Sequence, residues 1–168
     1  MTRGNLIGVF LLFLPVGQAI ALVDQPPLKA GYWSVQTTTS NSPGGSPAES
    51  KRFVCRNPEF DQWMRVTVES MTKRMGCKIV TEKFADNTYT SETHCAQSGS
   101  RTITRTTSVL TGDSAMHTET VTTFDPALNG LEKKTLISEQ KWIGACPAGA
   151  APGDNVSTDG QITHLWRH

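Results

Sequence analysis

The 168-residue chain carries 16 basic and 15 acidic side chains, which gives a formal net charge of +1 at pH 7. Nucleic-acid binding and adhesion to anionic membranes both rely on surplus Lys and Arg, so this balance argues against both classes of function. The length suits one domain with a modest hydrophobic core.

The first 21 residues have the layout of a cleavable signal peptide. Arg3 gives a positive start, an apolar run extends from Leu6 to Val16, and Ala19-Ile20-Ala21 has the small-x-small form of a cleavage site. A membrane-spanning helix needs about 20 apolar residues, and this run is too short. We therefore expect cleavage after Ala21, a periplasmic location, and no stable membrane anchor in the mature protein.

The mature part begins with two predicted strands. Residues 31–37 alternate in polarity and place Trp33 and Val35 on one face, which is typical of a half-buried strand. Residues 40–50 are rich in Ser, Gly and Pro and are predicted to form a flexible loop. A second short strand is expected at Lys51–Cys55.

One helix is predicted after Cys55. Asn57 is placed to cap it, and Pro58 suits its first turn. Apolar residues then recur at helical spacing and form one stripe, which is more typical of a face packed on a sheet than of a ligand surface. The stripe consists of Phe60, Trp63, Met64, Val68 and Met71.

The rest of the domain is predicted to be β-structure. Strands at 78–84 and 88–95 flank a tight turn at Asp86-Asn87, strands at 101–110 and 115–124 flank a Gly-containing turn, and a last strand runs from Leu131 to Trp142. Residues 125–130 are expected to be a connection. The apolar residues expected to point inward are Ile79, Val80, Phe84, Ile103, Val109, Met116, Val121, Phe124, Leu136 and Ile137.

These elements predict a mainly β (α+β) fold. We expect a curved antiparallel meander sheet or partial barrel of about six to seven strands, with one packed helix. The domain is predicted to span residues 22–146. Residues 147–168 have a linker-like composition, and the sequence leaves open whether this tail docks as an extra strand or is disordered.

Cys55, Cys77, Cys95 and Cys146 are predicted to form two structural disulfides, because an even number of cysteines follows an export signal. Their spacing matches no usual zinc pattern, and the chain has no CxxC pair. The preferred pairing is Cys55–Cys77 with Cys95–Cys146. Cys77–Cys95 with Cys55–Cys146 is nearly as plausible, since a hairpin would bring Cys77 and Cys95 together.

The order of these features resembles the bacterial exported family catalogued as domain of unknown function 3617. That family has a GxW strand near the mature start, a Cys before a short helix, two Cys around a β-hairpin and a final GxC-like segment. The corresponding residues here are Gly31-Tyr32-Trp33, Cys55, Cys77 with Cys95, and Gly144-Ala145-Cys146. The likeness covers about residues 29–146 and implies no activity, cofactor or catalytic residue.

The sequence contains no recognised catalytic motif. The leading hypothesis is a non-catalytic protein that binds an apolar small molecule or an envelope component in a cleft lined by Trp33, Trp63 and Met64. One alternative is a hydrolase or isomerase with a site around His117, Glu119 and the strand arginines Arg101 and Arg105. Another is a passive structural or stress-related protein. No cofactor or metal is predicted, since His164 and His168 alone would bind a metal weakly.

Overall fold

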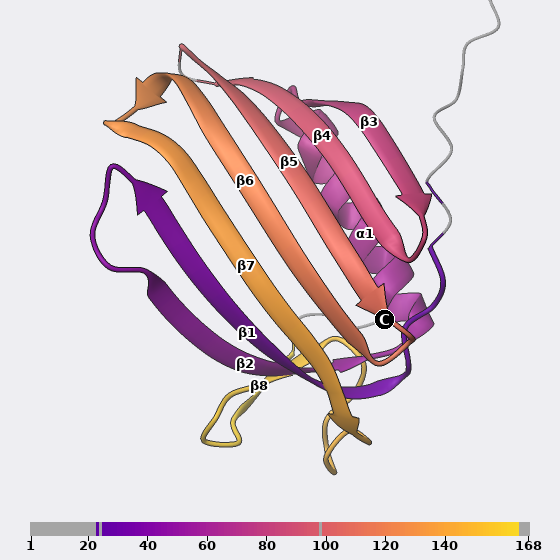
Figure 1. Cartoon of the computed structure of the whole chain (residues 1–168). Coiled ribbons are helices and arrows are strands. Elements are labelled where there is room, and N and C mark those ends of the chain that lie inside the picture. The colour runs from indigo at the N-terminus through magenta and orange to yellow at the C-terminus, as the bar shows by residue number, and fades with distance from the viewer. Residues whose placement is uncertain (1–22, 24, 98, 165–168) are drawn as a thin grey trace, which may run out of the picture.

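The computed structural model describes residues 23, 25–97 and 99–164, and the expected signal peptide, residues 1–21, lies outside them. The described chain forms one antiparallel sheet in the order β3-β4-β5-β6-β7-β1-β2-β8-β9, with a single helix, α1 (Figure 1). The sheet is not closed, because β3 and β9 are its two edges. The elements are β1 (Gly31–Ser42), β2 (Ala48–Arg56), α1 (Pro58–Arg74), β3 (Lys78–Ala85), β4 (Thr88–Gln97), β5 (Ser100–Thr111), β6 (Ala115–Leu128), β7 (Leu131–Gly144), β8 (Asp154–Val156) and β9 (Ile162–His164).

The predicted mainly β fold with one helix is confirmed, and the strands are longer than the sequence indicated. Asp86 and Asn87 have φ of 51° and 59° and make the tight β3–β4 turn that was expected. Strands β1 and β2 extend into the predicted loop at 40–50, which shrinks to a short connection between them. Strand β6 likewise runs through the predicted connection at 125–130 and reaches Leu128.

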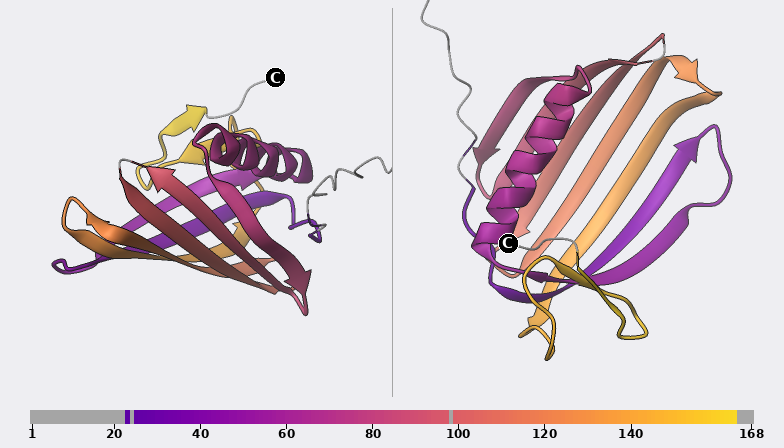
Figure 2. Two further views of the ribbon diagram at one scale, coloured as in Figure 1. Left: turned by 90° about the horizontal axis from the view of Figure 1, so that it is seen from above. Right: turned by 180° about the vertical axis from the view of Figure 1, so that it is seen from behind.

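Helix α1 begins where its capping signal predicts. The Oδ1 atom of Asn57 accepts a hydrogen bond from the backbone N–H of Phe60 at 2.9 Å, and Pro58 occupies the first turn. The helix lies over the concave side of the sheet (Figure 2). Among the residues of the helix, only Phe60 is buried.

The prediction that the apolar stripe of α1 packs on the sheet is therefore wrong for most of the stripe. Trp63 is half-buried, but the exposed fractions of Met64, Val68 and Met71 are 39%, 55% and 47%. The helix meets the core only through its first turns, so the rest of the stripe lies beside open space.

The core lies where the first turn of α1 packs against β1 and β2. It consists of Trp33, Val35, Val54 and Phe60, with Leu28, Trp63 and Trp142 packed against it. The fully buried indole of Trp33 donates its N–H to the carbonyl oxygen of Lys29 at 2.9 Å, which satisfies its polar atom.

The glycine two positions before Trp33, Gly31, is required by close packing. Its φ is 136°, and a Cβ atom placed there would collide with the Gly144 carbonyl oxygen and the Trp142 indole. Only glycine allows β1 and β7 to approach so closely at this end.

The disulfides are Cys55–Cys146 and Cys77–Cys95, with Cα–Cα distances of 5.7 Å and 4.2 Å. The preferred pairing of Cys55 with Cys77 and of Cys95 with Cys146 is therefore wrong, and the alternative pairing is the one formed. The reason is the 17-residue helix between Cys55 and Cys77. At 1.5 Å per residue it is about 25 Å long, far beyond the reach of a disulfide.

The tail after Cys146 returns to the sheet. Strand β8 pairs with β2 through Phe53↔Val156 and Val54↔Asn155, and the Gly153 N–H donates to the Cys55 carbonyl oxygen at 2.8 Å. The sequence left open whether this segment docks as an extra strand or is disordered, and the structure shows that it docks through β8.

Candidate functional site

A pocket of about 370 Å³ lies between the N-terminal half of α1 and the concave face of the sheet. We call it the trough pocket. Residues from five strands and the helix line it, namely Val35, Arg52, Val54, Arg56, Phe60, Asp61, Met64, Met116, Gln140 and Asn155.

The strand register explains how these distant residues reach one face. Directly paired residues of antiparallel strands point to the same side of a sheet. Val35 pairs with both Arg52 and Gln140, and Gln140 pairs with Met116. The alternation of β2 then places Val54 and Arg56 on the same side as Arg52.

Arg56 is the central polar group of the pocket. Its Nε donates to Asp61 Oδ1 at 2.8 Å, its Nη1 donates to Gln140 Oε1 at 2.7 Å, and its guanidinium lies 5.1 Å from the centre of the Trp33 ring. Only 14% of the Arg56 side chain and 17% of the Asp61 side chain are exposed. The pair is therefore held in a fixed geometry by charge-assisted hydrogen bonds and by the aromatic face.

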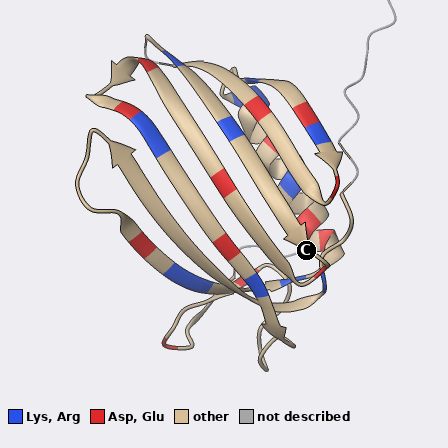
Figure 3. Ribbon diagram, in the orientation of Figure 1, with Lys and Arg blue, Asp and Glu red and all other residues tan. Residues whose placement is uncertain are grey.

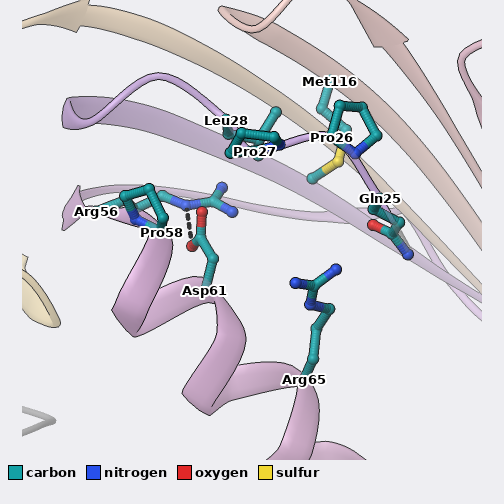
Figure 4. Close-up of a pocket in the computed structure, with 9 residues that line it drawn as sticks. All are labelled: Gln25, Pro26, Pro27, Leu28, Arg56, Pro58, Asp61, Arg65 and Met116. Atoms are coloured by element: carbon teal, nitrogen blue, oxygen red, sulfur yellow. Dashed lines mark hydrogen bonds and ion pairs between the residues drawn. The ribbon is translucent and has the colours of Figure 1, made fainter. Parts of the chain in front are cut away.

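A second, smaller pocket of about 130 Å³ adjoins the first (Figure 4). We call it the lead pocket, because residues 25–28, which lead into β1, form one of its walls. Pro58 and Arg65 of α1 complete its lining, and Arg56, Asp61 and Met116 are shared with the trough pocket.

Two polar atoms of α1 at the lead pocket lack partners. Asp61 Oδ2 and Arg65 Nε are buried and have no hydrogen-bond partner among the described residues. Figure 4 shows the guanidinium groups of Arg56 and Arg65 on either side of the Asp61 carboxylate. A buried polar atom without a partner costs free energy, so this corner favours a polar group that can complete the hydrogen bonds.

The exposed part of the helix stripe continues from the trough pocket. Met64, Val68, Met71 and Met75 follow Phe60 at helical spacing and so share one side of α1. Their exposed fractions lie between 39% and 55%. Because Phe60 and Met64 line the trough pocket, the stripe extends its apolar wall along the helix.

The three residues expected to line a cleft have different positions. Met64 lines the trough pocket, Trp33 is fully buried in the core beneath it, and Trp63 is half-buried with its ring stacked on Phe60 at 5.9 Å. Sequence reasoning missed Arg52 and Arg56 of β2. The alternation Arg52-x-Val54-x-Arg56 was the signal that places these arginines on the face that carries Val54.

His117 and Glu119 lie exposed on the opposite, convex face of the sheet. His117 Nδ1 lies 2.5 Å from Glu139 Oε1 of the neighbouring strand, and Arg105 Nε donates to Glu92 Oε2 at 2.7 Å. Acidic and basic residues are interspersed along the strands of the sheet (Figure 3). The structure thus places the charged groups of the enzyme hypothesis away from the trough and lead pockets.

The tail histidines are the residues that the sequence offered as metal ligands. Across residues 23, 25–97 and 99–164, no group of three or more His, Cys, Asp or Glu side chains is arranged to hold a metal ion. His164 Nδ1 lies 2.6 Å from Asp154 Oδ1, and His168 lies outside the described residues.

The fold and the pockets define a class: a small disulfide-linked protein in which one open antiparallel sheet carries a single helix on its concave side. Two disulfides indicate an oxidising, exported environment. The model of the family "Protein of unknown function (DUF3617)" matches residues 28–146, and the chain belongs to that family. No curated protein matches the chain, and no solved structure matches it.

Within the described residues, none of the helical structure is long and apolar enough to cross a membrane.

Proposed function

We propose that this protein is a non-catalytic, exported protein of the bacterial periplasm that binds an apolar small molecule in the trough pocket. The observation that carries the proposal is the apolar stripe of α1: Phe60 and Met64 line a pocket, and the residues that follow them in the stripe are exposed instead of being packed on the sheet. A folded domain of this size usually buries such a stripe, and an exposed apolar wall beside a cavity is typical of a binding site.

The size and lining of the pocket support a small ligand. Its volume of about 370 Å³ lies in the range of small-molecule sites, about 300–1,000 Å³. Val35, Val54, Phe60, Met64 and Met116 supply apolar walls, and the other five lining residues are polar, with Arg56 hydrogen-bonded to Asp61 and Gln140. Apolar walls with a few fixed polar groups are the composition that such sites share.

The test is a binding titration with the uncharged fluorescent dye Nile red. We expect saturable binding to the wild-type chain and at least about tenfold weaker binding to Met64→Asp, since the new carboxylate would lose hydration when the dye enters. Val66→Asp is the matched control, because Val66 is also exposed on α1 and does not line the trough pocket.

Three outcomes decide the proposal. Weaker binding by M64D with normal binding by V66D supports it, provided that circular dichroism shows both variants folded. The absence of saturable binding to the wild-type chain would overturn it. Equal losses in the two variants would also overturn it, because the dye would then bind outside the trough pocket.

A further inference from the structure

The trough pocket and the lead pocket meet at Arg56, Asp61 and Met116. The two pockets therefore adjoin at these three side chains, so one elongated molecule can contact both. Both pockets contain two guanidinium groups and the Asp61 carboxylate, but the trough pocket continues into the methionine-rich stripe of α1, whereas the lead pocket contains Arg65, whose Nε is buried without a partner among the described residues.

The charges at the lead pocket do not cancel. Asp61 forms its ion pair with Arg56, which leaves Arg65 as an additional positive charge. The Nη2 atom of Arg65 donates to the neutral side-chain amide of Gln62 at 2.6 Å, and its buried Nε has no hydrogen-bond partner in the described part of the chain.

The nearby acidic groups of the helix and sheet are engaged elsewhere. Glu69, one helical turn beyond Arg65, pairs with Lys73 at 2.5 Å. Glu82 of β3 accepts a hydrogen bond from the Tyr89 hydroxyl at 2.9 Å, and it forms no ion pair with Arg65 within the described part of the chain. Arg65 is therefore a cation at the pocket wall that forms no ion pair with any carboxylate of the described residues.

We infer that the ligand of this protein is a single-chain amphiphile with an anionic oxygen-bearing head, a carboxylate or a phosphate, which binds Arg65 in the lead pocket while its apolar chain lies in the trough pocket. This inference rests on the proposed function. The planar guanidinium group offers paired donors that match the oxygens of such a head. The head also supplies an acceptor for the buried Nε atom of Arg65.

The length of the stripe agrees with a chain rather than a compact ligand. From Met64 to Met75 the helix rises about 16 Å at 1.5 Å per residue. The apolar tail of a single-chain amphiphile can follow this line of side chains, whereas a compact apolar molecule would contact only the trough pocket.

The experiment displaces Nile red with four amphiphiles of equal chain length, each below its micelle-forming concentration: tetradecanoate, tetradecyl phosphate, tetradecanol and tetradecyltrimethylammonium. We expect the two anions to displace the dye at concentrations at least about tenfold lower than the alcohol, and the cation to be weakest. The better of the two anions identifies the head as carboxylate or phosphate.

Arg65→Gln should remove the preference for anions, so that tetradecanoate and tetradecyl phosphate displace the dye no better than tetradecanol does. Arg74→Gln is the matched control, because it removes one positive charge from the last turn of the same helix at an exposed side chain that lines neither pocket. Loss of the preference in R65Q alone supports the inference. Equal displacement by all four compounds, or equal losses in R65Q and R74Q, would overturn it.

Failure of the inference differs from failure of the proposed function. If all four compounds displace the dye alike from the wild-type chain and M64D still weakens their binding, the trough pocket binds apolar molecules without discriminating between head groups. If no compound displaces the dye and M64D has no effect, the proposed function itself fails.

Discussion

Side-chain hydroxyls pair across strands β5 and β6 on the concave face of the sheet. Thr104 and Thr122 lie 3.1 Å apart, Thr106 and Thr120 3.3 Å, and Ser108 and Thr118 2.9 Å, oxygen to oxygen. Each such pair contributes roughly 0.2–1 kcal/mol relative to alanines. The threonines of these strands thus do more than favour an extended backbone, because they also satisfy one another on a face that the helix overhangs.

Tyr89 on β4 gives a prediction about pH. Burial, the largest effect, raises the pKa of its hydroxyl from 10.0 to about 12, and the hydroxyl donates to Glu82. The unfolded chain therefore releases this proton first as the pH rises. The stabilisation by the buried, protonated phenol is full below pH 10 and is lost as the pH rises through about 12.

The measurement is an ultraviolet titration of tyrosinate absorbance. The chain has two tyrosines, so a Tyr32→Phe variant reports Tyr89 alone. We expect the folded variant to titrate at about 12 and the same variant in denaturant to titrate near 10. A single titration near 10 in the folded variant would show that the hydroxyl is solvated.

At the scale of elements, the helix shows what the sequence could and could not predict. Its cap at Asn57, its position after Cys55 and its apolar stripe were all readable from local pattern. The separation of the stripe from the sheet was not, because it depends on how far the strands curve away beneath α1. The stripe was predicted to be a core face, but Phe60 and Met64 of it line the trough pocket.

Three errors at this scale had signals in the sequence. A helix of the predicted length already separates Cys55 from Cys77 too far for a disulfide. Asn129-Gly130 is a strong hairpin signal, and with φ of 52° and 81° it makes the turn between β6 and β7. Val109 and Ile137, predicted to face inward, belong to the exposed alternate face, since their strand neighbours Leu110 and Ser138 are the buried ones.

The disulfides give a prediction about stability. Their sequence separations are 91 residues for Cys55–Cys146 and 18 for Cys77–Cys95. Loop-closure entropy then predicts that replacing Cys55 and Cys146 by Ala lowers the free energy of unfolding by about 4.6 kcal/mol, against about 3.2 kcal/mol for Cys77 and Cys95.

Urea unfolding of the two double-alanine variants measures this difference. Peptide mapping of the wild-type chain without reduction checks the pairing itself. A larger loss for the short loop, or a peptide that joins Cys55 to Cys77, would contradict the arrangement described above.

At the scale of the whole molecule, an open sheet has edge strands whose unpaired backbone groups could pair with another chain. Strand β2 would be an edge but for β8, which pairs with its C-terminal half at Phe53 and Val54. The remaining part of β2 carries Glu49, Lys51 and Arg52, and charged side chains on an exposed edge discourage pairing with another chain. The tail after Cys146 therefore completes the sheet next to the trough pocket, to which it contributes Asn155.

This role of the tail is tested by two truncations that both keep the disulfides. Deleting residues 147–168 removes β8 and with it Val156, which is 4% exposed, so we expect a loss of about 2 kcal/mol or more in the free energy of unfolding. The uncovered edge of β2 should also promote self-association. Deleting only residues 158–168 removes β9 and keeps β8, so it should leave the oligomeric state of the full chain unchanged. Light scattering and urea unfolding measure both effects, and identical behaviour of the two truncations would show that β8 does not protect the sheet.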